Sequence, residues 1–318
     1  MKLTTGAPGA RIAGLGDYRP HRVVTNDELA QVVDTSDEWI RSRVGIRQRH
    51  FAGEGESLVD MAVAASGKAL AASGLGPEDI DLLIMATCSA PTSIPGVGPT
   101  VADRLGLRGP GAYDLNAACA GFCYALSAAS DAIRTGSARR VLVIGAERLT
   151  DWVDPLDRGT CIIFADGAGA AVVVGTDEPA IGPVVWGSDG SKREAIIVRD
   201  RATMMEMDGQ GVFRWATTRL APVARECCER AGVTLADIDV FVPHQANLRI
   251  VDSMVRALGL QHAAIGRDIV ESGNTSSASI PLALTRMLER GEAKSGDLTL
   301  VLGFGAGLTY AGQVLRCP

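Results

Sequence analysis

Short apolar runs recur along the chain, and each follows a turn and leads toward a segment rich in small helix-forming residues. The clearest runs are 82–86, 142–145, 238–243 and 300–303. Continuous apolar runs of this length are typical of strands buried on both faces, as in parallel sheets. The regular alternation of strands with helices predicts an α/β protein in which helices cover mainly parallel sheets.

The same order of segments occurs twice. The matching pairs are 74–81 with 232–239, 116–120 with 274–278, and 142–145 with 300–303. All three pairs share an offset of 158 residues. A further match, 101–107 with 254–260, has an offset of 153, so the first half carries five extra residues near 86–100. Chance similarity does not reproduce a whole order of segments, and the chain is therefore predicted to be an internal duplication.

Two duplicated α/β halves that share helices between their sheets resemble the thiolase-like architecture. We expect layers in the order α-β-α-β-α, with mixed but mainly parallel sheets. The turn between Gly175 and Gly190 is rich in Gly, Pro and Asp, which favours a boundary there. The predicted halves are residues 1–175 and 176–318.

Composition narrows the class of protein. The chain has 318 residues, of which 47% are hydrophobic, and a formal net charge of −6, whereas nucleic-acid surfaces are usually basic. No apolar run approaches the roughly 20 residues that cross a bilayer. We expect a cytoplasmic protein that binds neither nucleic acid nor membrane.

The cysteines show neither a disulfide framework nor a metal site. They are Cys88, Cys119, Cys123, Cys161, Cys227, Cys228 and Cys317. Their number is odd and they form no C-x-x-C modules with nearby histidines, so we expect no structural metal. Most of them are expected to be small buried hydrophobes.

Cys119 differs because it lies where a short strand gives way to a helix of small residues. Unpaired N–H groups and the dipole at a helix start lower a thiol pKa, which favours the reactive thiolate. We therefore predict that Cys119 is a nucleophile. Cys123, one helical turn later, is expected to contribute to packing.

Two further residues are candidates for the same site. His244 ends the predicted strand 238–243, at the edge where open α/β sheets place their sites, whereas His21, His50 and His262 lie in segments expected at the surface. Asn274 lies in the loop that mirrors the Cys119 loop. A structural histidine and a turn-capping asparagine are the alternatives.

Four segments resemble the signatures of the β-ketoacyl-acyl-carrier-protein (ACP) synthase III family. They are ACAGF at 118–122, PHQANLRI at 243–250, GNTS at 273–276 and GFGAGL at 303–308. Further matches are DTSDEWI at 34–40 and DRGT at 157–160. The segments occur in the family's order, and the resemblance covers nearly the whole chain.

The resemblance implies an acyltransferase that initiates fatty acid synthesis. Cys119 would take an acyl group from a short or branched acyl-CoA, and malonyl-ACP would then lose carbon dioxide and condense to 3-oxoacyl-ACP. His244 and Asn274 would stabilise the enolate, while the N–H groups of Cys119 and Ala306 would form the oxyanion hole. The thioesters are substrates, and no cofactor is implied.

The resemblance also implies binding surfaces. The expected CoA contacts are Trp39, Arg43, Arg158, Met207, Gly209, Phe213 and Asn247. Arg249 and Arg256, seven residues apart on one helix, would form a basic patch for the acidic ACP. The acyl pocket would include Phe164, Phe304 and Ile94, the last reaching across a homodimer interface.

Departures from the family pattern concern the rim of the CoA site. Val44 stands where many relatives have threonine, Ala306 where many have glycine, and the segment 190–209 is shorter than in typical members. Ile94 replaces the phenylalanine of some members, which leaves room for a larger starter.

Other functions fit less well. The glycines at 303–307 lack the following helix and strand of a dinucleotide-binding unit. A thiolase would need a second catalytic cysteine, an elongating synthase a second histidine, and a non-catalytic acyl-binding subunit no nucleophile. A starter-unit ketosynthase of a polyketide pathway has the same triad and stays open as the alternative.

Overall fold

The computed structural model describes residues 1, 4–200 and 202–318. Two five-stranded sheets form its centre. The first has the order β1 (Gly9–Tyr18), β7 (Asp166–Thr176), β6 (Arg140–Arg148), β4 (Leu82–Ala86), β5 (Gly111–Leu115). The second has the order β8 (Val185–Ser188), β14 (Thr309–Arg316), β13 (Leu298–Gly305), β11 (Val240–Pro243), β12 (Ala264–Ile265).

Both sheets are mixed, as expected, but parallel pairs do not dominate. In the first sheet β6, β4 and β5 are parallel, whereas β1 with β7 and β7 with β6 are antiparallel. The second sheet repeats this division. The antiparallel share was underestimated because β6 and β7, and likewise β13 and β14, need no crossover helix between them.

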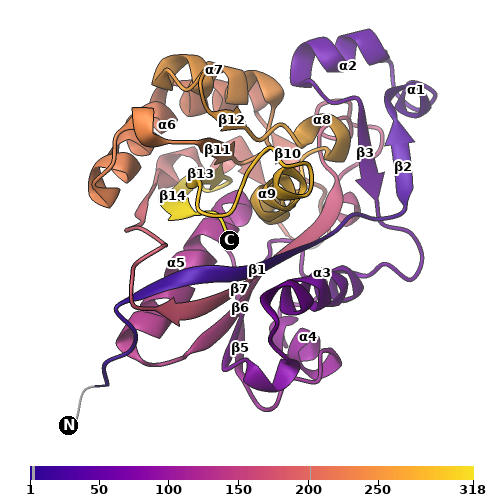
Figure 1. Cartoon of the computed structure of the whole chain (residues 1–318). Helices are drawn as coiled ribbons and strands as arrows, with labels where there is room; N and C mark the ends of the chain where they lie inside the picture. Colours follow the sequence, from indigo (N-terminus) through magenta and orange to yellow (C-terminus); the bar gives the residue numbers. More distant parts are fainter. Residues whose placement is uncertain (2–3, 201) are drawn as a thin grey trace.

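Helices separate and cover the two sheets. Figure 1 shows α5 (Gly121–Thr135) and α9 (Ser279–Glu289) between the sheets, with α3 (Leu58–Ser73) and α4 (Gly98–Arg104) beyond the first sheet. On the opposite side lie α6 (Gly209–Ala231) and α7 (Leu248–Leu258). A cluster of buried residues joins α5 and α9 to strands of both sheets. The layers therefore follow the expected order α-β-α-β-α.

The duplication is visible element by element. At the offset of 158, Leu82 of β4 maps onto Val240 of β11, and the partner of each maps correctly: Leu82 pairs with Val141, and Val240 with Thr299. The helices preceding these strands, α3 and α6, end at equivalent glycines, Gly74 and Gly232, both in left-handed conformation. The repeat seen in the sequence thus preserves strand register.

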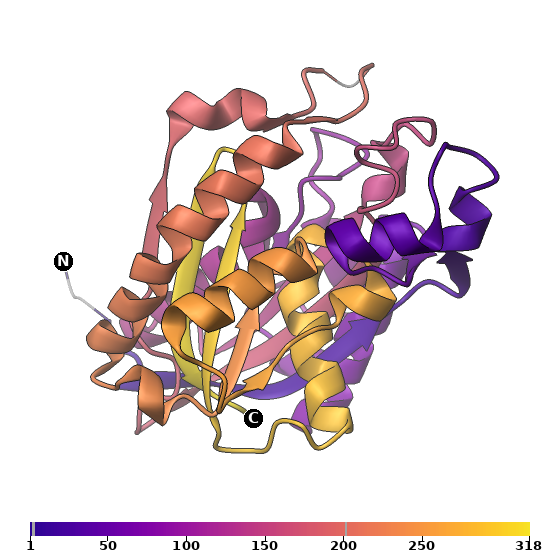
Figure 2. The same ribbon diagram turned by 90° about the horizontal axis from the view of Figure 1, so that it is seen from above.

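Smaller elements surround the sheets at one end. β2 (Arg22–Thr25) and β3 (Gln48–Phe51) flank α1 (Asn26–Leu29) and α2 (Asp37–Val44), and α8 (Ile269–Ser272) contacts β3. A hairpin of β9 (Ile196–Ile197) and β10 (Glu206–Met207) precedes α6. Figure 2 shows α6 and α7 side by side across the second sheet. Six short 3-10 helices occur among the described residues: 77–79, 118–120, 149–151, 190–195, 235–237 and 276–278.

No helix within the described residues is long and apolar enough to cross a membrane. We propose the division into residues 1–175 and 176–318, because the first sheet draws its strands from the first range, apart from Thr176 at the end of β7, and the second sheet from 185–316.

Candidate active site

Cys119 lies in a 3-10 turn, 118–120, that leads directly into α5. Its side chain packs against β13, where a Cβ atom on Gly305 would come within 2.8 Å of the sulfur. Only glycine fits at this position, and Cys119 itself is 9% exposed. The turn therefore holds the sulfur at the wall of a cavity rather than at the surface.

The cavity brings together the three residues singled out in the sequence. Cys119, His244 and Asn274 all line a cavity of about 100 Å³, although they come from the turn before α5, the residue after β11 and the loop after α8. Seven more expected residues line it: Ala306, Met207, Gly209, Phe213, Asn247, Phe164 and Phe304. A wider cavity of about 620 Å³ adjoins it and shares Cys88, Ala118 and Ala306.

His244 follows the last residue of β11 and is 1% exposed. Its Nδ1 lies 2.7 Å from the hydroxyl of Ser279, and its ring meets the ring of Phe304 edge-on at 5.1 Å. Burial lowers the pKa of His244 to about 3. The imidazole is therefore neutral at physiological pH. His50, expected at the surface, is half-buried, with Nδ1 2.7 Å from the carbonyl of Pro20.

Asn274 is held on both sides. Its N–H donates to the carbonyl of Ile163 and its carbonyl accepts from the N–H of Ala165, both at 2.9 Å. The side-chain Oδ1 accepts from the N–H of Ser276 at 2.9 Å. The oxygen of this amide accepts, and its Nδ2 group is the part that can donate to a substrate.

The ionisation of Cys119 differs from the sequence prediction. Burial raises the pKa of the thiol to about 12, and hydrogen bonds from Ser276 and from the N–H groups of Cys119 and Ala306 offset this only in part. The helix start was expected to lower the pKa, but desolvation outweighs it because the sulfur lies inside an apolar cavity. The resting group is a thiol.

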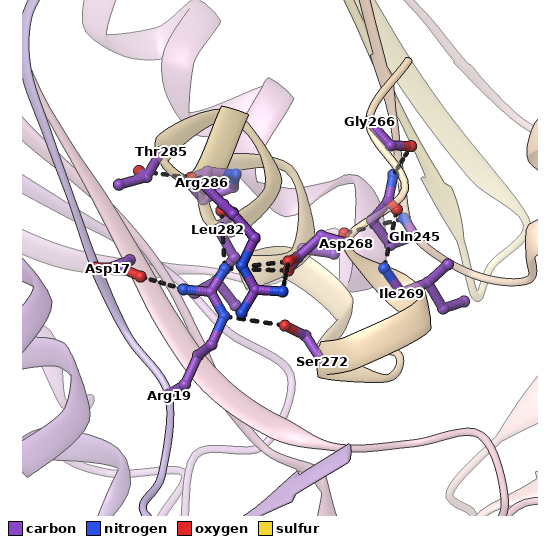
Figure 3. A network of polar contacts seen from close by, with 12 residues as sticks. Asp17, Arg19, Gln245, Gly266, Asp268, Ile269, Ser272, Leu282, Thr285 and Arg286 are labelled. Atoms are coloured by element: carbon purple, nitrogen blue, oxygen red, sulfur yellow. Dashed lines mark hydrogen bonds and ion pairs between the residues drawn. The ribbon is translucent and has the colours of Figure 1, made fainter. Parts of the chain in front are cut away.

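A polar network supports the loops that carry His244 and Asn274. Gln245 donates to the carbonyl of Gly266 and accepts from the N–H of Ile269, which begins α8. Figure 3 shows Asp268 beside the guanidinium groups of Arg19 and Arg286, which hold it by ion pairs of 3.2 and 2.5 Å. The network thus joins β1 and α9 to the segment that leads into Asn274.

Trp39, Arg43 and Arg158, which are expected to bind CoA, pack together and partly close the expected adenine site. Arg158 and Arg43 lie over the indole of Trp39 at 4.8 and 5.7 Å. A stacked ring needs about 3.5 Å on each side, so no adenine fits between Trp39 and Arg158 until the arginine moves. Arg158 also donates to the carbonyl of Asp34 at 2.8 Å.

One residue of the expected ACP patch, Arg249, lies beside the cavity. Arg249 and Arg256 are both exposed on α7, and the Arg249 guanidinium lies 5.2 Å from the centre of the Phe213 ring. Because Phe213 lines the cavity, Arg249 lies at its edge.

Ile94 does not line either cavity described above. It lies in the loop between β4 and α4, where its side chain is 90% exposed.

Three residues near Cys119 were missed by the sequence analysis. Cys88 and Ser276 line the cavity, and the buried carboxylate of Glu147 lies behind Ser276. The signal for Glu147 was present in the repeat, since the offset of 158 maps it onto Gly305 beside Cys119. Among the described residues, no group of three or more His, Cys, Asp or Glu side chains is placed to hold a metal ion.

Comparisons with known proteins identify the family. Residues 113–190 match the model of 3-oxoacyl-ACP synthase III, and residues 228–317 match the model of its C-terminal part. A β-ketoacyl-ACP synthase III of Streptomyces coelicolor is 52% identical over 313 residues, with 98% of this chain and 99% of the relative covered.

Solved structures agree with this assignment. A priming β-ketosynthase from a polyketide biosynthetic pathway has a TM-score of 0.96 at 44% identity, covering 100% of this chain and 98% of that one. The 3-oxoacyl-ACP synthase III of Pseudomonas aeruginosa has a TM-score of 0.93 at 41% identity, covering 98% of both chains. The chain belongs to the β-ketoacyl-ACP synthase III family.

Proposed function

We propose that the protein transfers a short or branched acyl group from acyl-CoA to Cys119 and condenses it with malonyl-ACP to give 3-oxoacyl-ACP. The observation that carries this proposal is the convergence of Cys119, His244 and Asn274 in one cavity, from both halves of the chain. No step requires a metal or a redox cofactor, because the loss of carbon dioxide generates the carbanion.

In the first half-reaction the sulfur of Cys119 attacks the thioester carbonyl of acyl-CoA. The N–H groups of Cys119 and Ala306 both face the sulfur, which supports their role as donors to the oxygen that becomes negative. The C–S bond to CoA then breaks, and the proton of the thiol leaves with the CoA sulfur. Because burial raises the pKa of Cys119 to about 12, we infer that the thiol loses its proton as it attacks.

In the second half-reaction His244 and Asn274 bind the carbonyl oxygen of the malonyl thioester. Neutral His244 can donate from Nε2 if its Nδ1 accepts from Ser279, and Asn274 can donate from Nδ2. As the malonyl C–C bond breaks, the electron pair forms an enolate whose charge these donors stabilise. The enolate carbon attacks the acyl group on Cys119 and releases the thiolate, which takes a proton from water to restore the resting thiol.

We further propose a cytoplasmic homodimer in which Ile94 approaches the acyl pocket of the partner. The malonyl group would arrive on ACP docked at Arg249 and Arg256, whose charge suits an acidic carrier. CoA would bind along Asn247 and Phe213 toward Trp39, after displacement of Arg158.

A starter-unit ketosynthase of a polyketide pathway is the second candidate. It is favoured by the TM-score of 0.96 to a priming β-ketosynthase, although the relative from Streptomyces coelicolor named as a β-ketoacyl-ACP synthase III is more similar in sequence. The two candidates share the chemistry and differ in the carrier protein.

The test measures the two half-reactions separately. Intact-protein mass spectrometry after incubation with a panel of acyl-CoAs should show one acyl group on Cys119. His244→Ala and Asn274→Ala should still be acylated but should release little labelled carbon dioxide from malonyl-ACP. Normal release by both variants would show that these residues do not stabilise the enolate. Comparing fatty-acid ACP with a polyketide-type carrier then separates the two candidates.

A further inference from the structure

Glu147, at the end of β6, is a fully buried carboxylate that the proposed reaction does not use. Its Oε2 accepts from the hydroxyl of Ser89 at 2.6 Å and from that of Thr87 at 3.1 Å. Its Oε1 accepts from the hydroxyls of Ser276 and Ser277 at 3.0 and 2.9 Å. Among the described residues no lysine or arginine forms an ion pair with it. A buried charge held only by neutral donors costs stability, which calls for an explanation.

The duplication shows what this position corresponds to. At the offset of 158, Glu147 maps onto Gly305 and Cys119 onto Ser277. Gly305 leaves the space that the Cys119 sulfur occupies, whereas the Glu147 side chain extends toward Ser277 and binds it. The turn at Ser277 in the second half is therefore the equivalent of the turn at Cys119. At Cys119 we expect a substrate to bind, whereas Ser277 binds the carboxylate of Glu147.

Ser276 connects this carboxylate to the candidate active site. Its hydroxyl lies 3.0 Å from Oε1 of Glu147 and 3.8 Å from the Cys88 sulfur, and it also forms a hydrogen bond with the Cys119 sulfur. Its N–H holds the Oδ1 of Asn274 at 2.9 Å. Ser276 has a left-handed backbone, with φ of 49°, and such strain persists only where neighbouring contacts impose it.

We propose that Glu147 is a positioning residue, which fixes Ser276 and through it both the amide of Asn274 and the thiol of Cys119. This inference rests on the proposed function. Glu147 touches neither the cavity nor a substrate placed in it. Its role is to hold the turn in which Ser276 contacts both Asn274 and Cys119.

Electrostatics supports this assignment. The described residues that line the cavity include no aspartate, glutamate, lysine or arginine. The titratable groups that face the Cys119 sulfur are Cys88 and His244 in the cavity wall and Glu147 behind Ser276. Burial is the main cause of the raised pKa of Cys119. The hydrogen bond with Ser276 lowers this pKa, and the charge of Glu147 raises it.

The experiment compares Glu147→Gln with wild type in three assays. We expect malonyl-ACP decarboxylation to fall at least about tenfold, because misplacement of a catalytic group by about 1 Å can cost a hundredfold. Acylation of Cys119 should change by no more than a few-fold. Alkylation of Cys119 by iodoacetamide at pH 8 should become at least about threefold faster, because burial still raises the pKa of the thiol but the charge of Glu147 no longer adds to it.

The matched control is Asp166→Asn, which alters another fully buried carboxylate; it is bound to Ala52 and Thr150, and none of the three lines the cavity. It should lower stability without changing the ratio of the half-reactions or the alkylation rate. If Glu147→Gln behaves in the same way, or leaves all three assays at wild-type values, the positioning role is wrong.

If Glu147→Gln does not fold, Ser276→Ala tests the positioning role instead. Alanine tolerates the same backbone at Ala118, with φ of 46°. This variant should reproduce the loss of decarboxylation but not the faster alkylation, because the charge of Glu147 remains. Wild-type decarboxylation by Ser276→Ala would overturn the proposal. Should wild-type protein itself fail to decarboxylate malonyl-ACP, the proposed function fails, whereas the alkylation assay still tests the coupling of Glu147 to Cys119.

Discussion

Ala118 and Ser276 adopt the same left-handed backbone conformation, with φ of 46° and 49°, at positions 158 residues apart. They are the two non-glycine residues with positive φ in the part of the chain that the structure describes. Each begins a 3-10 turn, and the next residues are Cys119 and Ser277. A left-handed conformation costs about 1–2 kcal/mol for such residues, so both halves retain a strained turn although one of them carries no thiol.

Cys119→Ser should abolish covalent acylation by acyl-CoA, because a hydroxyl is a far weaker nucleophile than a thiol at neutral pH. Intact-protein mass spectrometry measures the adduct. Cys88→Ser is the matched control, since Cys88 is the other thiol in the cavity, and it should remain acylated. If the Cys119→Ser variant is acylated and the Cys88→Ser variant is not, the nucleophile is Cys88.

The stability of the protein should decrease at acidic pH through His244. Its folded pKa, about 3, lies below the ordinary value of 6.5, so the unfolded chain binds the proton first as pH falls. Its contribution is complete above pH 6.5 and is lost toward pH 3, at up to about 1.4 kcal/mol per pH unit. Relative to His244→Gln, wild type should therefore lose unfolding free energy between pH 6.5 and 4.5. Parallel profiles from urea titrations would contradict the buried, neutral state.

Trp39→Ala should raise the KM for acyl-CoA about fivefold, because the loss of one cation–π or stacking contact weakens binding by about this factor. The kcat should change little, because Trp39 lies outside the cavity that contains Cys119. An acyl N-acetylcysteamine thioester, which lacks adenine, is the control and should show no change. Equal effects on both substrates would mean that Trp39 acts through folding.

Ile94→Phe should shift starter preference toward acetyl-CoA. The smaller isoleucine is expected to let wild type accept branched four- or five-carbon groups, and one or two buried methylenes are worth about tenfold. Competition between acetyl-CoA and isobutyryl-CoA measures the ratio. A wild type that takes only acetyl, or a ratio unchanged in the variant, would exclude Ile94 as the selectivity wall.

Asp268→Ala should destabilise the protein by about 3 kcal/mol, because Arg19 and Arg286 would stay largely buried without their shared carboxylate. Glu226→Ala is the control, since its ion pair with Arg230 is exposed and should contribute nothing measurable. Denaturant unfolding of both variants gives the comparison. Equal midpoints would show that the buried network does not hold α8 in place.

The amino-acid sequence alone determined the repeat, the order of strands and helices, and the choice of Cys119, His244 and Asn274 as candidates. These features are local or periodic: an apolar run, a glycine after a helix, and a motif at a constant offset are all visible without coordinates. The same offset contained the pairing of Glu147 with Gly305, but it carried no meaning until the packing of Cys119 was known.

Tertiary structure decided what depends on burial and on contacts between distant segments. The thiol of Cys119 has a raised pKa because the second half of the chain encloses it, and the helix start next to it in sequence cannot offset that desolvation. Glu147 binds Ser276 only because β6 of one half packs on the turn of the other. Desolvation and hydrogen bonding act through space, so neither could be predicted from spacing along the chain.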